Sequence, residues 1–210
     1  MPSPPPRREI PDPSKLPLVI FTPRLRLRPI APDDAEELWP FVSDPIVSRF
    51  LAWSPHQRID ESRAFIAEAN ASLAAGSDVI WAIEHDGRAR GTIGLHGIKW
   101  AHRAWRVDRG ELGYWIAPPL WGRGLMSEAA LAATRWGFET LGLHKITVGH
   151  VEGNAASKRI IEKIGFRYLA CFEEDAWKDG RWLRHQRYEL TAAEWASRSA
   201  RSSTSSASST

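Results

Sequence analysis

The chain has 210 residues, a formal net charge of +3 and 11 tryptophans, a length that predicts one domain with a single hydrophobic core. The small positive charge does not by itself indicate nucleic-acid binding, and the single cysteine, Cys171, excludes an intramolecular disulfide. No run approaches the ~20 apolar residues of a bilayer span, and the proline-rich start lacks the apolar run of a signal peptide, so we expect a cytoplasmic protein without a membrane partner.

Composition predicts a tail at each end of the chain. Residues 1–17 hold seven prolines and little apolar periodicity, which is typical of an extended or disordered segment. Residues 196–210 hold eight serines and two threonines, a composition that cannot bury apolar surface. We therefore predict a single domain over residues 18–195.

The first half of that domain alternates strands and helices. A strand over Leu25–Ile30 should lead into a helix opened by an Asp33–Glu36 capping box and broken at Pro40 and Pro45. A second helix should run from Asp60 to Ala75. Two strands over residues 79–84 and 90–98 are joined at Asp86-Gly87, a hairpin signal, and a loop rich in Trp and Arg should follow over residues 99–109.

Residues 111–140 contain the pattern of an anion site. Glu111–Ile116 alternates like a strand, two prolines end it, and the turn Trp121-Gly-Arg-Gly124 opens directly into helix formers from Met126 to Thr140. Glycines allow a tight turn and close ligand approach. The unpaired N–H groups of a helix's first turn favour a phosphate, whereas an ordinary tight turn is the alternative reading of the same pattern.

The second half continues with strand, helix and hairpin. A strand over Lys145–Val151 precedes a short amphipathic helix that starts near Asn154 and stops at Gly165. Alternation from Phe166 to Phe172 predicts a further strand, and Lys178-Asp-Gly180 should turn it into a partner over residues 181–190. The fold class is therefore mixed α/β.

Several of these motifs resemble those of the GNAT superfamily of acyl-CoA-dependent N-acetyltransferases in order and spacing. They are the turn Trp121-Gly-Arg-Gly-Leu-Met126, the helix start Asn154-Ala-Ala-Ser157 and Glu162-Lys-Ile-Gly-Phe166. Two further stretches, Thr22-Pro-Arg-Leu-Arg-Leu-Arg28 and Trp136-Gly-Phe-Glu-Thr-Leu-Gly-Leu-His-Lys145, are similar to the RimJ/RimL-like branch of ribosomal-protein N-terminal acetyltransferases. The resemblance covers about residues 20–195.

The resemblance implies a fold and a cosubstrate. The sheet should be mostly antiparallel, with two parallel central strands that splay apart, and it should be flanked by helices. Acetyl-CoA should bind without a metal, through the residues Trp115, Ile116, Ala117, Gly122, Arg123, Gly124, Leu125, Met126, Ser127 and Asn154. Two positions depart from the family pattern, since Trp121 stands where Gln or Arg is usual and Met126 where Gly or Ala is usual.

The resemblance also implies catalytic roles. Glu111 matches a strand glutamate that serves as general base in some relatives, while an exposed structural glutamate is the alternative. Asn154 matches a position that faces the cofactor or the acceptor, but it also suits a plain helix N-cap. Many relatives use as general acid a tyrosine at the position of Ile161, which cannot donate a proton. Either Ser157 or water must then protonate the leaving thiolate.

Three functions are compatible with this reading. The first is an acetyltransferase whose acceptor, most readily a protein N-terminal α-amine, attacks the thioester directly. The second is acetylation of a small amine such as an antibiotic or polyamine, and the third is a non-catalytic acyl-CoA-binding or ribosome-associated module. Glu173, Glu174 and Asp175 could hold a cationic acceptor, unless they form a solvated charge run. The sequence leaves open whether the protein is a monomer or a dimer.

Overall fold

One mixed sheet organises the protein. The structure is a computed structural model that describes residues 10–198, and its eight strands are ordered β1-β2-β3-β4-β5-β6-β8-β7. The strands are β1 (Ile20–Phe21), β2 (Arg26–Pro29), β3 (Val79–His85), β4 (Arg88–His102), β5 (Trp105–Ile116), β6 (Lys145–Val151), β7 (Arg167–Lys178) and β8 (Arg181–Thr191). All neighbours pair antiparallel except β5 and β6, which are parallel. The predicted fold class is confirmed.

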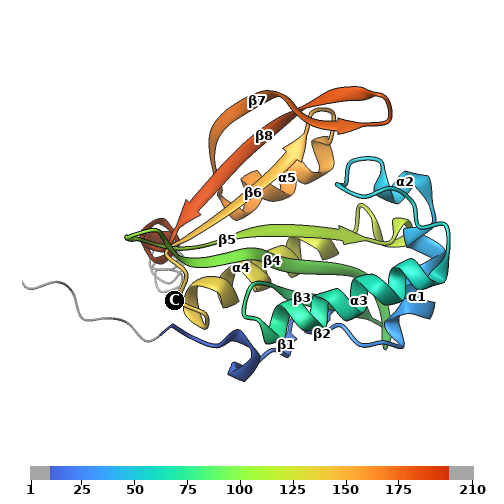
Figure 1. The fold of residues 1–210 in the computed structure, drawn as a ribbon, viewed down its shortest axis with the longest axis horizontal. Helices are drawn as coiled ribbons and strands as arrows, with labels where there is room; N and C mark the ends of the chain where they lie inside the picture. Colours follow the sequence, from blue (N-terminus) through green and yellow to red (C-terminus); the bar gives the residue numbers. More distant parts are fainter. Residues whose placement is uncertain (1–9, 199–210) are drawn as a thin grey trace, which may run out of the picture.

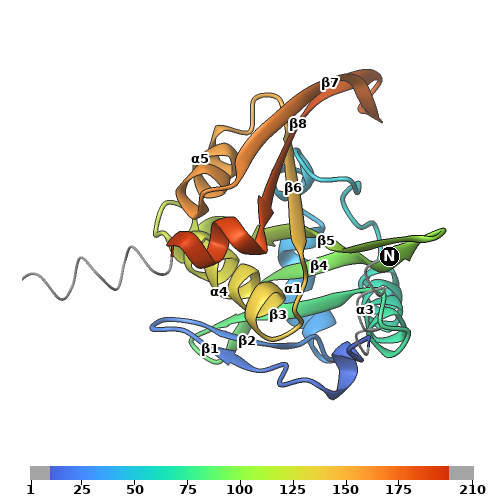
Figure 2. The same cartoon turned by 90° about the vertical axis from the view of Figure 1, so that its left-hand side faces the viewer.

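Helices cover both faces of this sheet (Figure 2). They are α1 (Asp34–Val42), α2 (Pro45–Ser48), α3 (Ile59–Ala74), α4 (Leu125–Glu139) and α5 (Ala155–Ile164), with short 3-10 turns η1 (Pro13–Lys15) and η2 (Pro118–Leu120). Residues 192–198 are also helical. Figure 2 separates α4 and α5 on one face from α3 on the other, so the sheet lies between two apolar layers.

Strand β5 contributes side chains to both layers because side chains alternate along a strand. Leu112 and Ile116 belong to the larger core cluster beneath α4, together with Ala129 and Ala133 of that helix. Trp115 packs instead against the smaller cluster of α1, α3 and β3. Odd and even positions of β5 therefore face different sides of the sheet.

The parallel pair separates before either strand ends. β5 and β6 are paired from Arg109 and Lys145 to Leu112 and Val148, whereas β5 continues to Ile116 and β6 to Val151. Figure 1 shows the two strands starting side by side and diverging toward their carboxyl ends. Backbone groups beyond the divergence lack a strand partner on that side and are available to a ligand.

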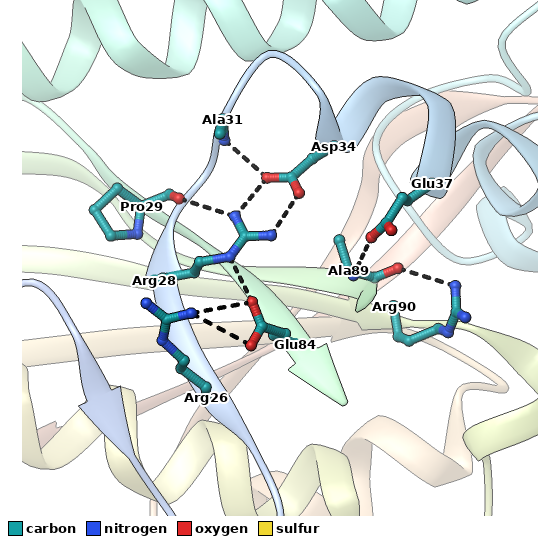
Figure 3. A network of polar contacts seen from close by, with 9 residues as sticks. All are labelled: Arg26, Arg28, Pro29, Ala31, Asp34, Glu37, Glu84, Ala89 and Arg90. Carbon is teal, nitrogen blue, oxygen red and sulfur yellow. Dashed lines mark hydrogen bonds and ion pairs between the residues drawn. The ribbon is translucent and has the colours of Figure 1, made fainter. Parts of the chain in front are cut away.

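A network of charged side chains fastens α1 to the sheet (Figure 3). Arg28 of β2 donates to both oxygens of Asp34, at 2.6 and 2.8 Å, and to Glu84 of β3 at 2.7 Å. Asp34 also accepts the N–H of Ala31. The Asp33 side chain makes no capping bond, so the predicted capping box is wrong: the neighbouring aspartate has the arginine partner and closes the turn.

Two segments differ from the sequence-based expectation. Residues 99–109 do not form a loop, because β4 and β5 extend through them as a hairpin with Lys99 paired to Arg109 and His102 to Trp105. Part of the expected N-terminal tail is ordered: Pro13–Lys15 forms η1, and the carbonyl of Pro17 accepts the indole N–H of Trp136. Residues 196–198, which were also predicted to belong to a tail, are helical. The remaining tail predictions, for residues 1–9 and 199–210, lie outside the described residues.

Candidate active site

The turn between β5 and α4 has the geometry of an anion site. Gly122 and Gly124 have φ of +73° and +75°, in the left-handed region that favours glycine. Glu128 donates the first intrahelical N–H of α4, to the Gly124 carbonyl. The N–H groups of the three residues before it, Leu125, Met126 and Ser127, precede the helical ladder and sit at the positive end of the helix dipole. The exposed Arg123 adds a cation beside them.

Arg24 contacts this turn, and the sequence analysis did not identify it as a site residue. Its guanidinium donates to the Arg123 carbonyl at 2.9 Å and pairs with Glu128 at 2.6 Å. Burial would raise the pKa of Glu128, but hydrogen bonds from Thr22 and Arg24 outweigh it and hold the pKa below its usual value. Arg24 thus neutralises a carboxylate in the helix's first turn and fixes the turn's backbone. In the sequence analysis, the Thr22–Arg28 motif supported only the family resemblance and had no predicted role in the site.

Every second residue of β5 directs its backbone N–H and C=O toward the strand divergence, and the resemblance did not specify which residues these are. Ala117 already donates its N–H to Arg90 of β4, and the Ile116 carbonyl accepts the indole N–H of Trp121 at 2.7 Å. Backbone groups of successive strand residues point to opposite edges. Tyr114 and Ile116 therefore present their backbone toward the divergence, whereas Trp115 and Ala117 face β4. Of the three expected pantetheine partners, only Ile116 has this orientation.

Asn154 and Ser157 lie at the start of α5, and Ser157 contacts β5. Asn154 is the N-cap, and its side-chain oxygen accepts the Ser157 N–H at 3.1 Å. The Ser157 hydroxyl is 3.0 Å from the hydroxyl of Tyr114. Burial raises the pKa of Tyr114 to about 12, against a smaller lowering by the Ser157 hydrogen bond, so the phenol keeps its proton at neutral pH. Together these contacts form a chain of hydroxyl groups from β5 to α5.

Ile161 is part of the core rather than of the site. Its side chain is fully buried in the cluster under α4, where a tyrosine would not fit without repacking. Tyr114 instead brings a phenol to α5 from the adjacent strand. The alternation of β5 could have indicated Tyr114 from the sequence. Leu112, Tyr114 and Ile116 occupy every second position and therefore share one face of the strand, the face toward α4.

The other face of β5 carries a charged cluster. Glu111, with its side chain 48% exposed, accepts from Arg187 of β8 at 2.7 Å. Arg187 also lies 3.6 Å from Asp175 of β7, and Asp175 accepts from the His185 ring at 3.0 Å. The structure therefore brings the expected base, Glu111, and the acidic segment of β7 together, with a cation between the two carboxylates.

The three acidic residues of β7 have different environments because they form a bulge. Between the paired residues Phe172 and Ala176, β7 holds three residues opposite the single Arg184 of β8, and Glu174 takes a positive φ of 48°. Glu173 pairs with Arg184, Glu174 is exposed, and Asp175 turns onto His185. A bulge re-aims side chains in this way.

The β7–β8 hairpin is fastened across this face. The Lys178 ammonium donates to the carbonyls of Leu51 and Trp53, at 2.9 and 2.7 Å. Trp53 packs edge-on against Trp115 of β5, with ring centroids 6.1 Å apart. These contacts connect the hairpin, the loop after α2 and β5 on the side of the sheet away from α4.

A cavity of about 490 Å³ lies between α5 and the β7–β8 pair, and its lining includes Asn154, His150, Tyr168 and Tyr188. It does not include the Gly122–Ser127 turn. Within residues 10–198 no group of His, Cys, Asp and Glu side chains is arranged to hold a metal. In the same residues no helix is long and apolar enough to span a bilayer.

Comparison with known proteins agrees with this geometry. Residues 24–167 match the family model described as the acetyltransferase (GNAT) domain. The chain is 30% identical over 164 residues to the uncharacterized N-acetyltransferase YoaA of Bacillus subtilis, covering 77% of this chain and 90% of that one. It is 32% identical over 84 residues to the [ribosomal protein uS5]-alanine N-acetyltransferase of Escherichia coli, covering 40% and 43%.

Among solved structures, the chain is similar to RimL, a ribosomal L7/L12 α-N-protein acetyltransferase in complex with coenzyme A. The TM-score is 0.73 at 17% identity, over 84% of this chain and 99% of that one, a likeness of fold. The parallel strands that diverge, the glycine turn opening α4 and the family match over most of the domain lead to one conclusion. The chain belongs to the GNAT family and is an N-acetyltransferase that uses acetyl-CoA.

Proposed function

We propose that the protein acetylates the N-terminal α-amine of a protein, by direct attack of the amine on the thioester of acetyl-CoA. The observation that carries this proposal is the acidic, aromatic-walled face of β5. Glu111 lies there just before the strand divergence and Trp115 beyond it, and Asp175 of β7 is joined to Glu111 through Arg187. Carboxylates attract an ammonium group, and the aromatic pair suits the first side chains of a peptide. The ribosomal-protein acetyltransferases among the relatives support this acceptor class.

The turn at Gly122–Ser127 would hold the diphosphate, with Arg123 as its cation, and the backbone of Tyr114 and Ile116 would hold the pantetheine arm. The amine nitrogen bonds to the carbonyl carbon and loses a proton, while the electron pair of the C–S bond passes to sulfur. Ser157, backed by Tyr114 at 3.0 Å, would protonate or hydrogen-bond the thiolate. An α-amine with a pKa near 8 is already partly neutral at pH 7, so a moderate base suffices.

Thiol release from acetyl-CoA, with mass spectrometry of the product, tests this function. The probes are an octapeptide with a free N-terminal alanine and no lysine, the same peptide with a blocked N-terminus, and spermidine. We expect acetylation of the free peptide and none of the blocked one. Acetylation of spermidine but not of the free peptide would show that the acceptor is a small amine and not a protein N-terminus. Acetyl-CoA binding without thiol release in any arm would contradict catalysis of these acceptors and favour a binding module.

A ribosomal setting follows from the same proposal. If the acceptor is a ribosomal protein, the enzyme works in the cytoplasm and contacts the ribosome or its free proteins. The hairpin of residues 99–109, which carries Trp105 with 75% of its surface exposed, is the surface proposed for that contact, through phosphate binding and base stacking.

A further inference from the structure

His185 occupies a position that no motif indicated. It lies on β8 opposite Val151 of β6 and Phe172 of β7, on the face of the sheet shared by Glu111 and Arg187. Its side chain is 18% exposed. The register places it beside the last residues of β6, just beyond Val148, where β6 leaves β5.

The imidazole is accommodated by a glycine. A Cβ built on Gly149 would lie 2.5 Å from Nε2 of His185, closer than side-chain atoms approach each other. Gly149 is the first residue of β6 after its last pair with β5. The absence of a side chain there lets the ring lie over β6 where the parallel strands part. It places Nε2 next to the β6 backbone, which borders the proposed path of the cofactor arm.

The other ring nitrogen has an orienting partner. Nδ1 lies 3.0 Å from Asp175 Oδ2, and an ionised carboxylate only accepts hydrogen bonds, so Nδ1 carries the proton and Nε2 keeps its lone pair in the neutral ring. Asp175 reaches the ring because of the β7 bulge and is steadied by Arg187 at 3.6 Å. A base oriented by a third group is the arrangement that proton abstraction requires.

We propose that His185 is the general base of this acetyltransferase, with Asp175 and Gly149 as positioning residues and Glu111 holding Arg187. The inference rests on acetyl transfer to an amine, whichever amine that is. Nε2 takes the proton that the amine loses as the N–C bond forms and the C–S bond breaks, and the imidazolium returns it to solvent.

The surroundings suit a ring that is neutral at physiological pH. Burial lowers the pKa of His185, Arg187 lowers it further, and the hydrogen bond and charge of Asp175 and the charge of Glu111 oppose them without prevailing. These are the charged groups of β7, β8 and β5 that act on the ring, and β6 presents Gly149 and Val151 there. Glu111 is a poorer candidate because it is half exposed and already paired with a guanidinium.

The test compares His185→Asn with Glu111→Gln and uses the alanine octapeptide and spermidine as separate acceptors. If the peptide is not acetylated but spermidine is, the effect of each variant on the general base can still be measured. The side-chain amide of asparagine can still donate a hydrogen bond to Asp175, but it cannot take up a proton at neutral pH. We expect His185→Asn to lower kcat at pH 7 by about 100-fold or more and to abolish the fall of kcat on the acid side. Acetyl-CoA affinity should be unchanged, and the exposed His144→Asn should behave as wild type.

A second variant and a measurement without turnover complete the test. Gly149→Ala should displace the ring and lower kcat while the protein stays folded by circular dichroism. Histidine-selective NMR of the unmodified enzyme should show His185 with Nδ1 protonated and titrating below pH 6.5. An imidazole already charged at pH 7, or an acid limb kept by His185→Asn and lost by Glu111→Gln, would overturn the proposal.

Discussion

At the scale of single residues, the chain has Ile161 where many relatives have a tyrosine, but the neighbouring strand β5 brings a phenol to the same helix. The pattern Asn154-Ala-Ala-Ser157 supplies one hydroxyl, and Tyr114 adds a phenol from β5. Since burial keeps that phenol protonated, with a pKa of about 12, it can donate to Ser157 and leave the serine proton free for sulfur. Such an interaction strengthens as negative charge develops on the leaving thiolate.

Ser157→Ala should therefore lower kcat by about 10- to 100-fold with little change in acetyl-CoA affinity. Tyr114→Phe should lower it less, since Ser157 keeps its own hydroxyl. The double variant should be no worse than Ser157→Ala, because Tyr114 acts through the serine. Steady-state kinetics and calorimetry of the three proteins measure this. Full activity of Ser157→Ala would assign the proton to water.

At the scale of elements, the cofactor turn is a junction of three segments. Strand β5 delivers the chain to η2, the two left-handed glycines reverse it, and α4 begins with its first N–H groups unbonded. Arg24, next to β2, ties the turn to Glu128. The left-handed conformation of Gly124 belongs to the helix start, and in the proposed function it also allows a phosphate to approach the backbone.

Gly124→Val should weaken acetyl-CoA binding by at least about 1 kcal/mol, because a β-branched residue is strained at a positive φ and hinders the diphosphate. Gly87→Val is the matched control, since Gly87 has nearly the same φ, +73°, in the β3–β4 turn with open space around it. It should show a similar loss of thermal stability and unchanged affinity. Equal affinities for both variants in calorimetry would place the diphosphate elsewhere.

At the scale of the whole molecule, one polar network connects β2 and β3, near one edge of the sheet, with helix α1. Arg28 joins Asp34 of α1 to Glu84 of β3 (Figure 3). The hydrogen bond from Arg28 lowers the pKa of Glu84, and Arg26 assists, against a rise from burial. Because the folded-state pKa is depressed, this contribution to stability is present above pH 4.5 and is lost as the pH falls through the lower folded value.

Glu84→Gln should lower the free energy of unfolding by roughly 2 kcal/mol at pH 7, since Arg28 loses a charged acceptor that is 15% exposed. The difference from wild type should shrink toward zero below about pH 4. Urea unfolding at several pH values measures it. Glu36→Gln, which removes an ion pair exposed to solvent, should have little effect at any pH. A constant difference across pH would show that packing, not charge, accounts for the loss.

The sequence by itself determined the order and type of most elements. Alternation, helix periodicity and glycine or proline stops predicted β3, β6, α4 and α5 close to their bounds, because these signals are local. The turn at Gly122–Gly124 was equally local, since its function depends on backbone conformation. Local signals failed where distant partners compete: the Arg28–Asp34 contact displaced the Asp33 capping box, and cross-strand pairing made a hairpin of residues 99–109.

Only the tertiary structure decided which side chains meet. Tyr114 and Ser157 are 43 positions apart in sequence, and Glu111 and Arg187 are 76 apart. Their contacts depend on the strand order β5-β6-β8-β7, on the parity of β5 and on a bulge in β7. No spacing along the chain encodes the place of His185 over Gly149. A one-residue shift of β8 against β6 would turn His185 to the other face of the sheet, so long-range register, not residue type, builds the acceptor side of the site.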